Sequence, residues 1–159
     1  MATKWDEQYD RAARYLKRLS DIAQGILHTA NSQTYADDLF AFFLNCYHIK
    51  DWIRSDPTTA GWTDVEAYVS GNRHLALCAD LCNAAKHCVL IRHRSTENPV
   101  FAGGDIRMKI TDGLSGREKI EIAINYKICT QSGELDALDV ARQCMTAWDA
   151  YLKVNAAAP

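Results

Sequence analysis

The sequence predicts a mainly α-helical protein. We expect an antiparallel bundle of four main helices and one short helix, with an antiparallel β-hairpin inserted at about residues 105–128. Apolar residues recur every three or four positions over most of the chain, which is the period of an amphipathic helix. From Asn98 onward the period becomes two, which is typical of strands. The helices are joined by short connections, which favour antiparallel neighbours.

The first two helices differ in how they present apolar residues. Residues 5–28 carry one apolar stripe between charged positions, as expected of a surface helix packed on a core. Residues 35–55 are apolar around most of the circumference, which indicates a central, buried helix that ends before Pro57. Within this second helix Asn45, His48 and Asp51 follow at steps of three and form one narrow polar stripe.

Capping residues delimit the next two helices. Thr63 and Glu66 have the spacing of a capping box at the start of the short helix, and Gly71 ends it. Asn72 is placed to cap a fourth helix over about residues 73–90. That helix has an apolar core face and a separate polar face, which is formed by Asp80, Asn83 and His87.

Strand patterning separates the fourth helix from the last one. Residues 106–110 and 120–128 alternate apolar and polar side chains, and the turn-rich stretch 112–116 connects them. Because an isolated hairpin is marginally stable in water, its isoleucine face should pack on the bundle or on a second subunit. Residues 132–134 are expected to open a final amphipathic helix over about residues 138–154.

Composition and charge place limits on function. With 159 residues the chain is expected to form a single domain, 1–159, that is large enough for its own core. A net charge of -2 gives no general case for binding nucleic acid or an anionic membrane. We find no signal-peptide pattern and no apolar run of membrane-spanning length, so we expect a cytoplasmic protein without membrane contact.

The six cysteines are expected to be reduced core residues rather than metal ligands. Cys78 and Cys82 share a helix face close to His87 and Cys88, which allows a metal site in principle. Zinc sites are usually built on a tight Cys-x-x-Cys knuckle in a loop, and this chain has none. We therefore predict no metal and no cofactor.

The polar face of the fourth helix resembles the HEPN family, helical-bundle proteins common in prokaryotic toxin–antitoxin and defence systems. The hallmark of that family is an Arg followed after four to six residues by a His, often written Arg-Asn-x-x-x-His. Asn83 and His87 match the Asn and the His of that pattern, while Cys82 stands in place of the Arg. In active members the Arg and His act together at a dimer interface to cut RNA. The resemblance therefore implies a degenerate member that forms a homodimer, with RNA and a protein from the same operon as the implied partners.

Catalysis would need a substitute for the missing arginine. RNA cleavage requires an acid or base near neutral pH and a cation for the phosphate. His87 suits the first role, although a histidine at a helix end is also favoured by the helix dipole. For the second role the nearest cations are Lys86, which points about a quarter turn away, and Arg92 and Arg94, which could fold back from beyond the helix.

Two further arrangements are considered for binding residues. His48 and Asp51 could satisfy each other inside the bundle. Alternatively, Asp51 could face Lys86 or His87 and build a polar cluster between the second and fourth helices. The stretch from Lys86 to Lys109 holds five positive and two negative residues, a local balance of +3 that could meet phosphates.

These observations lead to three functional hypotheses. The first is a HEPN-like binding or regulatory protein of a prokaryotic defence or toxin–antitoxin system, with weak or no catalysis. The second is a metal-independent ribonuclease that uses His87, with Asn83 in a positioning role. The third is a structural, dimeric scaffold protein whose polar face, including Asp80, is a dimer interface.

Overall fold

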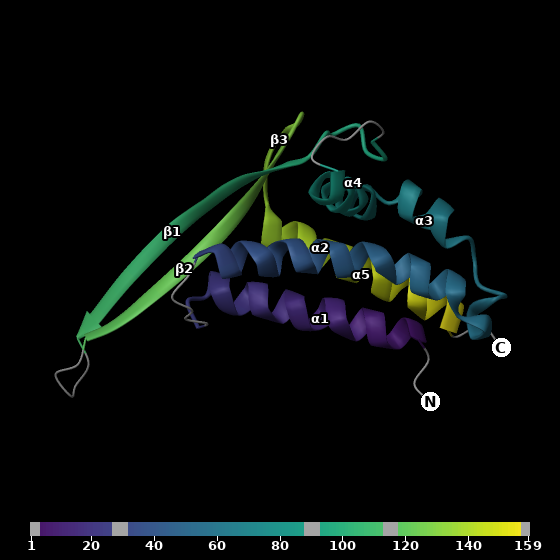
Figure 1. Cartoon of the computed structure of the whole chain (residues 1–159), viewed down its shortest axis with the longest axis horizontal. Helices are drawn as coiled ribbons and strands as arrows, with labels where there is room; N and C mark the ends of the chain where they lie inside the picture. Colours follow the sequence, from purple (N-terminus) through teal and green to yellow (C-terminus); the bar gives the residue numbers. More distant parts are fainter. Residues whose placement is uncertain (1–3, 27–31, 88–92, 113–117, 157–159) are drawn as a thin grey trace.

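The fold is mainly helical and carries a small antiparallel sheet. A computed structural model describes residues 4–26, 32–87, 93–112 and 118–156 (Figure 1). Its elements, in chain order, are α1 (Lys4–Ala23), α2 (Ser32–Ser55), the short 3-10 helix η1 (Pro57–Thr59), α3 (Val65–Gly71), α4 (Arg73–His87), β1 (Val100–Asp112), β2 (Glu118–Thr130), β3 (Gly133–Asp136) and α5 (Ala137–Ala156). The predicted class, a helical bundle with a hairpin, is therefore confirmed. None of the described helices combines the length and the apolar character needed to cross a membrane.

The core lies between α2 and the helices around it. Figure 1 shows α1, α2 and α5 extended in similar directions, with α3 and α4 on the side of α2 away from α1. Trp148 of α5 is fully buried, and its indole Nε1 donates a hydrogen bond to the carbonyl oxygen of Cys46 in α2 at 3.2 Å. Phe42 and Phe43 of α2 are also fully buried, which confirms α2 as the predicted central helix.

Local signals explain most helix ends. The side chain of Asn72 accepts hydrogen bonds from the backbone of residues 74 and 75, so the predicted cap of α4 is confirmed. α1 ends at Ala23, earlier than predicted, because Gly25 adopts a left-handed backbone with φ 72°. The Ile26 N–H then reaches the Asp21 carbonyl at 2.9 Å, which closes a Schellman-type turn. Residues 27 and 28 lie outside the described residues.

The predicted capping box of α3 is wrong by one residue. Asp64, not Thr63, is the cap, and its Oδ1 accepts hydrogen bonds from the backbone of Glu66 and Ala67. The Thr63 N–H and hydroxyl donate instead to Oδ1 of Asn155 in α5, at 2.8 and 3.1 Å. The hydrogen bonds from Thr63 to the distant Asn155 therefore take the place of the cap interaction predicted for Thr63.

The sheet is larger than the predicted hairpin. β1 and β2 pair in antiparallel register with Ile106 opposite Ile124 and Met108 opposite Ile122, and β3 adds to the other side of β2. Residues 133–134 thus belong to β3 rather than to the last helix. A turn between β2 and β3 explains this difference. Gly133 has a φ of 131°, and its carbonyl accepts a hydrogen bond from the Thr130 hydroxyl at 2.9 Å, so the chain reverses here and pairs with β2.

The β1–β2 ribbon extends past the end of the bundle (Figure 1). Ile124 and Ile128 of β2 are buried against the helices, which agrees with the prediction that the isoleucine face packs on the bundle. Ile106 and Met108 of β1 lie on the same face of the ribbon, yet 63% and 62% of their surface is exposed. Part of the apolar face is therefore uncovered in the single chain.

Candidate functional site

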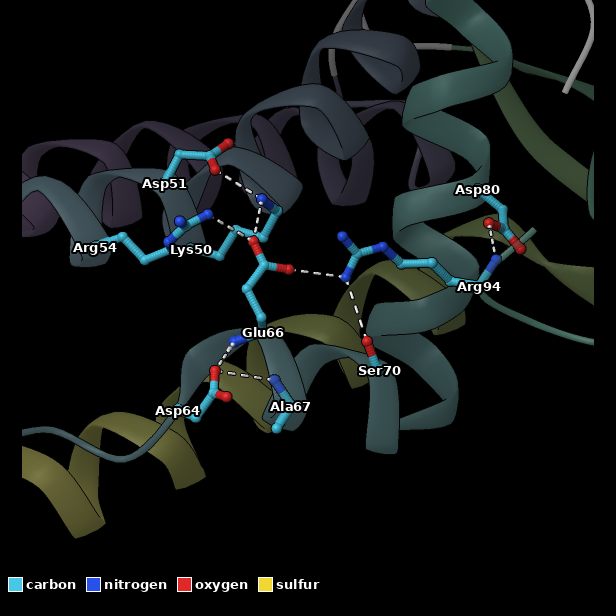
Figure 2. Close-up of polar contacts among 9 residues, drawn as sticks. All are labelled: Lys50, Asp51, Arg54, Asp64, Glu66, Ala67, Ser70, Asp80 and Arg94. Atoms are coloured by element: carbon cyan, nitrogen blue, oxygen red, sulfur yellow. Dashed lines mark hydrogen bonds and ion pairs between the residues drawn. The ribbon is translucent and has the colours of Figure 1, made fainter. Parts of the chain in front are cut away.

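A network of charged side chains joins α2, α3 and the segment after α4 (Figure 2). Its centre is Glu66 on α3. One carboxylate oxygen accepts Lys50 Nζ at 2.8 Å and Arg54 Nη1 at 3.0 Å, both from α2. The other oxygen accepts Arg94 Nη1 at 3.0 Å. Four side chains from three parts of the chain are thus held together, and we refer to them with Asp51 as the Glu66 network.

The network favours the charged forms of Lys50 and Glu66. Lys50 is 7% exposed and also donates to Asp51 Oδ1 at 2.6 Å. Burial opposes the charge on Lys50, but its hydrogen bonds to Asp51 and Glu66 raise its pKa. Burial likewise opposes ionisation of Glu66, yet the hydrogen bonds from Lys50 and Arg94 lower its pKa to about 2. The ring of Tyr47 lies 4.8 Å from Lys50 Nζ and 5.6 Å from the Arg94 guanidinium, which adds cation–π contacts.

Asp80 on α4 fastens the segment that carries Arg94. Its carboxylate is almost fully buried, at 1% exposure, and accepts the backbone N–H groups of Arg94 and Ser95 at 2.7 and 2.8 Å. The Ser95 hydroxyl donates to the same carboxylate at 2.6 Å, and His93 Nδ1 lies 3.9 Å away. The polar face predicted for α4 is therefore covered at Asp80 by residues 93–95, which sequence periodicity cannot reveal.

The structure brings together three of the predicted site residues. Asp51 and Arg94 both belong to the Glu66 network, and Asp80 holds the backbone of Arg94 (Figure 2). Of the two arrangements considered for Asp51, the pair with His48 is not among the described contacts, since Asp51 accepts from Lys50 and His48 Nδ1 lies 2.7 Å from the Leu44 carbonyl one turn earlier. The other arrangement involves the side chains of Lys86 and His87, which lie outside the described part of the chain.

The remaining predicted residues are placed only in part. Asn83 is half-buried on α4, three residues beyond Asp80. Lys86 and His87 continue the helix, but their side chains lie outside the part of the chain that the structure describes. Arg92 also lies outside the described residues.

Sequence reasoning did not identify Lys50, Arg54 or Glu66 as members of a site. A lysine inside an otherwise apolar helix is a usable signal, because buried lysines are nearly always paired. Its partner could not be deduced, since Glu66 is 16 residues away on another helix. Chemically, the network carries three cations and two carboxylates, and a carboxyl group with a pKa near 2 is far from the range needed for acid–base catalysis at neutral pH.

A second cluster lies in the core. The sulfur atoms of Cys46, Cys78 and Cys144 all lie within 4.8 Å of one another, and all three residues are buried. Burial raises the pKa of Cys78 and of Cys144. Burial opposes ionisation of Cys46 as well, but the neighbouring polar groups of Cys144, Cys78 and Trp148 lower its pKa. Within the described part of the chain these three residues could hold a metal ion, and only Cys78 belongs to the set considered from sequence.

Comparison with known proteins gave no assignment. No model of a known protein family, no curated protein and no solved structure matches this chain.

Proposed function

We propose that this protein acts by binding rather than by catalysis. It would be a HEPN-like binding or regulatory protein of a prokaryotic defence or toxin–antitoxin system. The observation that carries this proposal is the way Asp80 and Arg94 are used. Asp80 accepts three hydrogen bonds that hold Arg94 and Ser95, and the Arg94 guanidinium is bonded to Glu66 and Ser70 instead of projecting freely toward solvent (Figure 2). A carboxylate and a cation engaged in this way stabilise the fold, and neither is free to serve a reaction.

An RNA cleavage assay tests the absence of catalysis. Purified protein is incubated with mixed RNA without metal, beside the His87→Ala variant and a matched histidine control, His93→Ala. We expect all three to leave the RNA at the background level. Cleavage by the wild type that His87→Ala abolishes and His93→Ala retains would overturn the proposal and favour a ribonuclease.

The binding surface that we propose is the open edge of β1, and the occupant is a second copy of the chain. Among the described strands β1 pairs only with β2, so its other edge offers unpaired backbone groups. Next to this edge the apolar face is uncovered at Ile106 and Met108. A long exposed edge with an apolar face is a site of strand addition.

Charge complementarity favours a second copy over other occupants. A two-fold axis at Ile106 would pair β1 with β1 of the second copy in antiparallel register. Residues whose numbers add to 212 would then lie opposite each other, so Asp105 would face Arg107 of the second copy on both sides of the axis. Opposite residues of such a pair share a face, so the two apolar faces would join into one.

Sedimentation velocity across a concentration series measures this self-association. We expect Ile106→Lys to give a monomer, because the charge lies at the centre of the interface, whereas Val154→Lys should not change the wild-type behaviour. Val154 is a matched control, because it is an apolar residue of α5 with 69% exposure.

A charge swap tests the register. Arg107→Asp should weaken the dimer by placing like charges opposite each other. The double variant Asp105→Arg/Arg107→Asp should restore part of the dimer, because Asp105 also pairs with Lys127 of its own chain at 3.1 Å. A wild type that stays monomeric would overturn this interface. Retention of mixed RNA by such a monomer would assign the binding function to RNA instead.

A further inference from the structure

Three thiols from three different helices meet in the core. Cys46 lies on α2, Cys78 on α4 and Cys144 on α5, and each is at most 1% exposed. Their positions in the sequence are far apart, so no local spacing brings them together. The packing of the bundle places all three sulfur atoms within 4.8 Å of one another. This cluster is separate from the Glu66 network and from the ribbon, and its chemistry is independent of the proposed function.

The spacing suits a three-coordinate ion. Thiolate sulfur binds metals such as zinc at about 2.3 Å, so three sulfurs around one ion lie at most about 4 Å from each other, the value for a planar arrangement, and closer where the arrangement is pyramidal as for arsenic(III). The observed limit of 4.8 Å therefore requires only small side-chain adjustments. The Cys78 thiol donates to the Phe43 carbonyl at 3.4 Å and the Cys144 thiol to the His74 carbonyl at 3.3 Å, which fixes both side chains.

The net charge of the complex decides which ion these three thiolates would bind best. The three cysteines belong to the main apolar core, where an uncompensated charge is costly. A divalent ion with three thiolates leaves one negative charge. A trivalent ion with three thiolates is neutral, so the dry surroundings favour it.

We propose that Cys46, Cys78 and Cys144 form a trithiolate site for a thiophilic trivalent ion, for which arsenic(III) is the appropriate chemistry. Arsenous acid, As(OH)3, would react with the three thiols. Three S–H and three As–O bonds break, three As–S bonds form, and each thiol proton leaves with a hydroxide as water. The products are one neutral arsenic trithiolate and three water molecules, with no change of oxidation state.

Native mass spectrometry of the reduced protein tests this site with arsenite as the probe. Because the thiols are buried, entry requires a transient opening of the core, and the protein is incubated until the spectrum is constant. We expect one adduct whose mass gain equals one arsenic atom less three hydrogen atoms. Capture by only two thiols would retain a hydroxyl group on arsenic and give a different mass, so that result would overturn a three-thiol site.

Single cysteine variants identify the ligands. Cys46→Ser, Cys78→Ser and Cys144→Ser should each lose the three-thiol adduct, whereas Cys129→Ser, outside the cluster, should keep it. Circular dichroism establishes that each variant is folded. The wild-type mass remains decisive even where a variant does not fold.

A second measurement tests the charge argument. Arsenite should raise the melting temperature of the wild type, since a ligand that binds only the folded state stabilises it. Cadmium should do so less, because its trithiolate is charged. A stable cadmium adduct at these cysteines without an arsenic adduct would overturn the choice of a trivalent ion. Absence of both adducts would overturn the site itself.

Discussion

Neutralising Glu66 should remove a measurable part of the stability of the fold. The Glu66→Gln variant keeps the shape of the side chain but loses the charge that Lys50, Arg54 and Arg94 surround. A fall in pKa from the ordinary value of 4.5 to about 2 sets an upper limit of about 3 kcal/mol on the free energy of unfolding that the charge contributes. Because the carboxylate is 31% exposed, solvent screens it, and we expect a loss of about 1–2 kcal/mol at neutral pH.

The sign of the pH dependence follows from the lowered pKa. The contribution of Glu66 is fully present above about pH 4.5, where the carboxyl group is ionised in both the folded and the unfolded chain. It is lost as the pH falls from there toward about 2, because the unfolded chain takes up the proton first. The difference between wild type and Glu66→Gln should therefore be largest at neutral pH and shrink in acid.

Urea unfolding followed by circular dichroism at several pH values measures this difference. Glu7→Gln is the matched control, because Glu7 pairs with Arg11 across one turn of α1 and its side chain is 60% exposed. We expect that control to change the free energy of unfolding by less than about 0.5 kcal/mol. A Glu66→Gln effect that stays the same from pH 7 to pH 3, or one no larger than that of the control, would refute the reasoning.

Three further substitutions test separate contacts. Asp80→Ala should lower the free energy of unfolding by roughly 2–3 kcal/mol and should speed hydrogen exchange at the amide of Ser95, since two partly buried N–H groups lose their acceptor. Unchanged exchange at Ser95 would contradict the anchoring role of Asp80. Asn155→Ala should lower the free energy of unfolding in urea by about 1–2 kcal/mol, because it removes the side chain that joins α5 to the loop before α3. Gly103→Ala should lower the melting temperature and reduce the free energy of unfolding by about 1–2 kcal/mol, because the φ of 75° at this position strains any residue with a Cβ atom. Gly61→Ala is the control and should leave the melting temperature unchanged, because Gly61 does not have a positive φ.

The sequence is sufficient for features that depend on neighbours along the chain. Asn72 is recognisable as a cap because its partners lie two and three residues away. The alternation around Ile106 and Ile124 predicts the hairpin. β3 escapes prediction because it depends on the turn at Gly133 and on pairing with β2, neither of which leaves a clear periodic signal in four residues.

The candidate sites are harder to predict, because they are built from distant segments. Periodicity assigns Asp80 to an open polar face, but the segment after α4 covers it. Periodicity describes the face of one helix and cannot state what crosses over it. The cysteines are a second example. Their spacing along α4 predicts that Cys78 and Cys82 lie together, whereas packing of the helices brings Cys78 next to Cys46 and Cys144.

The position of Trp148 has a consequence for synthesis of the chain. Its indole is buried against α2, and its bond to the Cys46 carbonyl spans 102 residues. α5 is translated after all other described elements, so the apolar surface of α2 stays open until α5 has emerged from the ribosome. The core therefore cannot be completed before α5 has been synthesised, and the cooperative folding step should follow the release of α5.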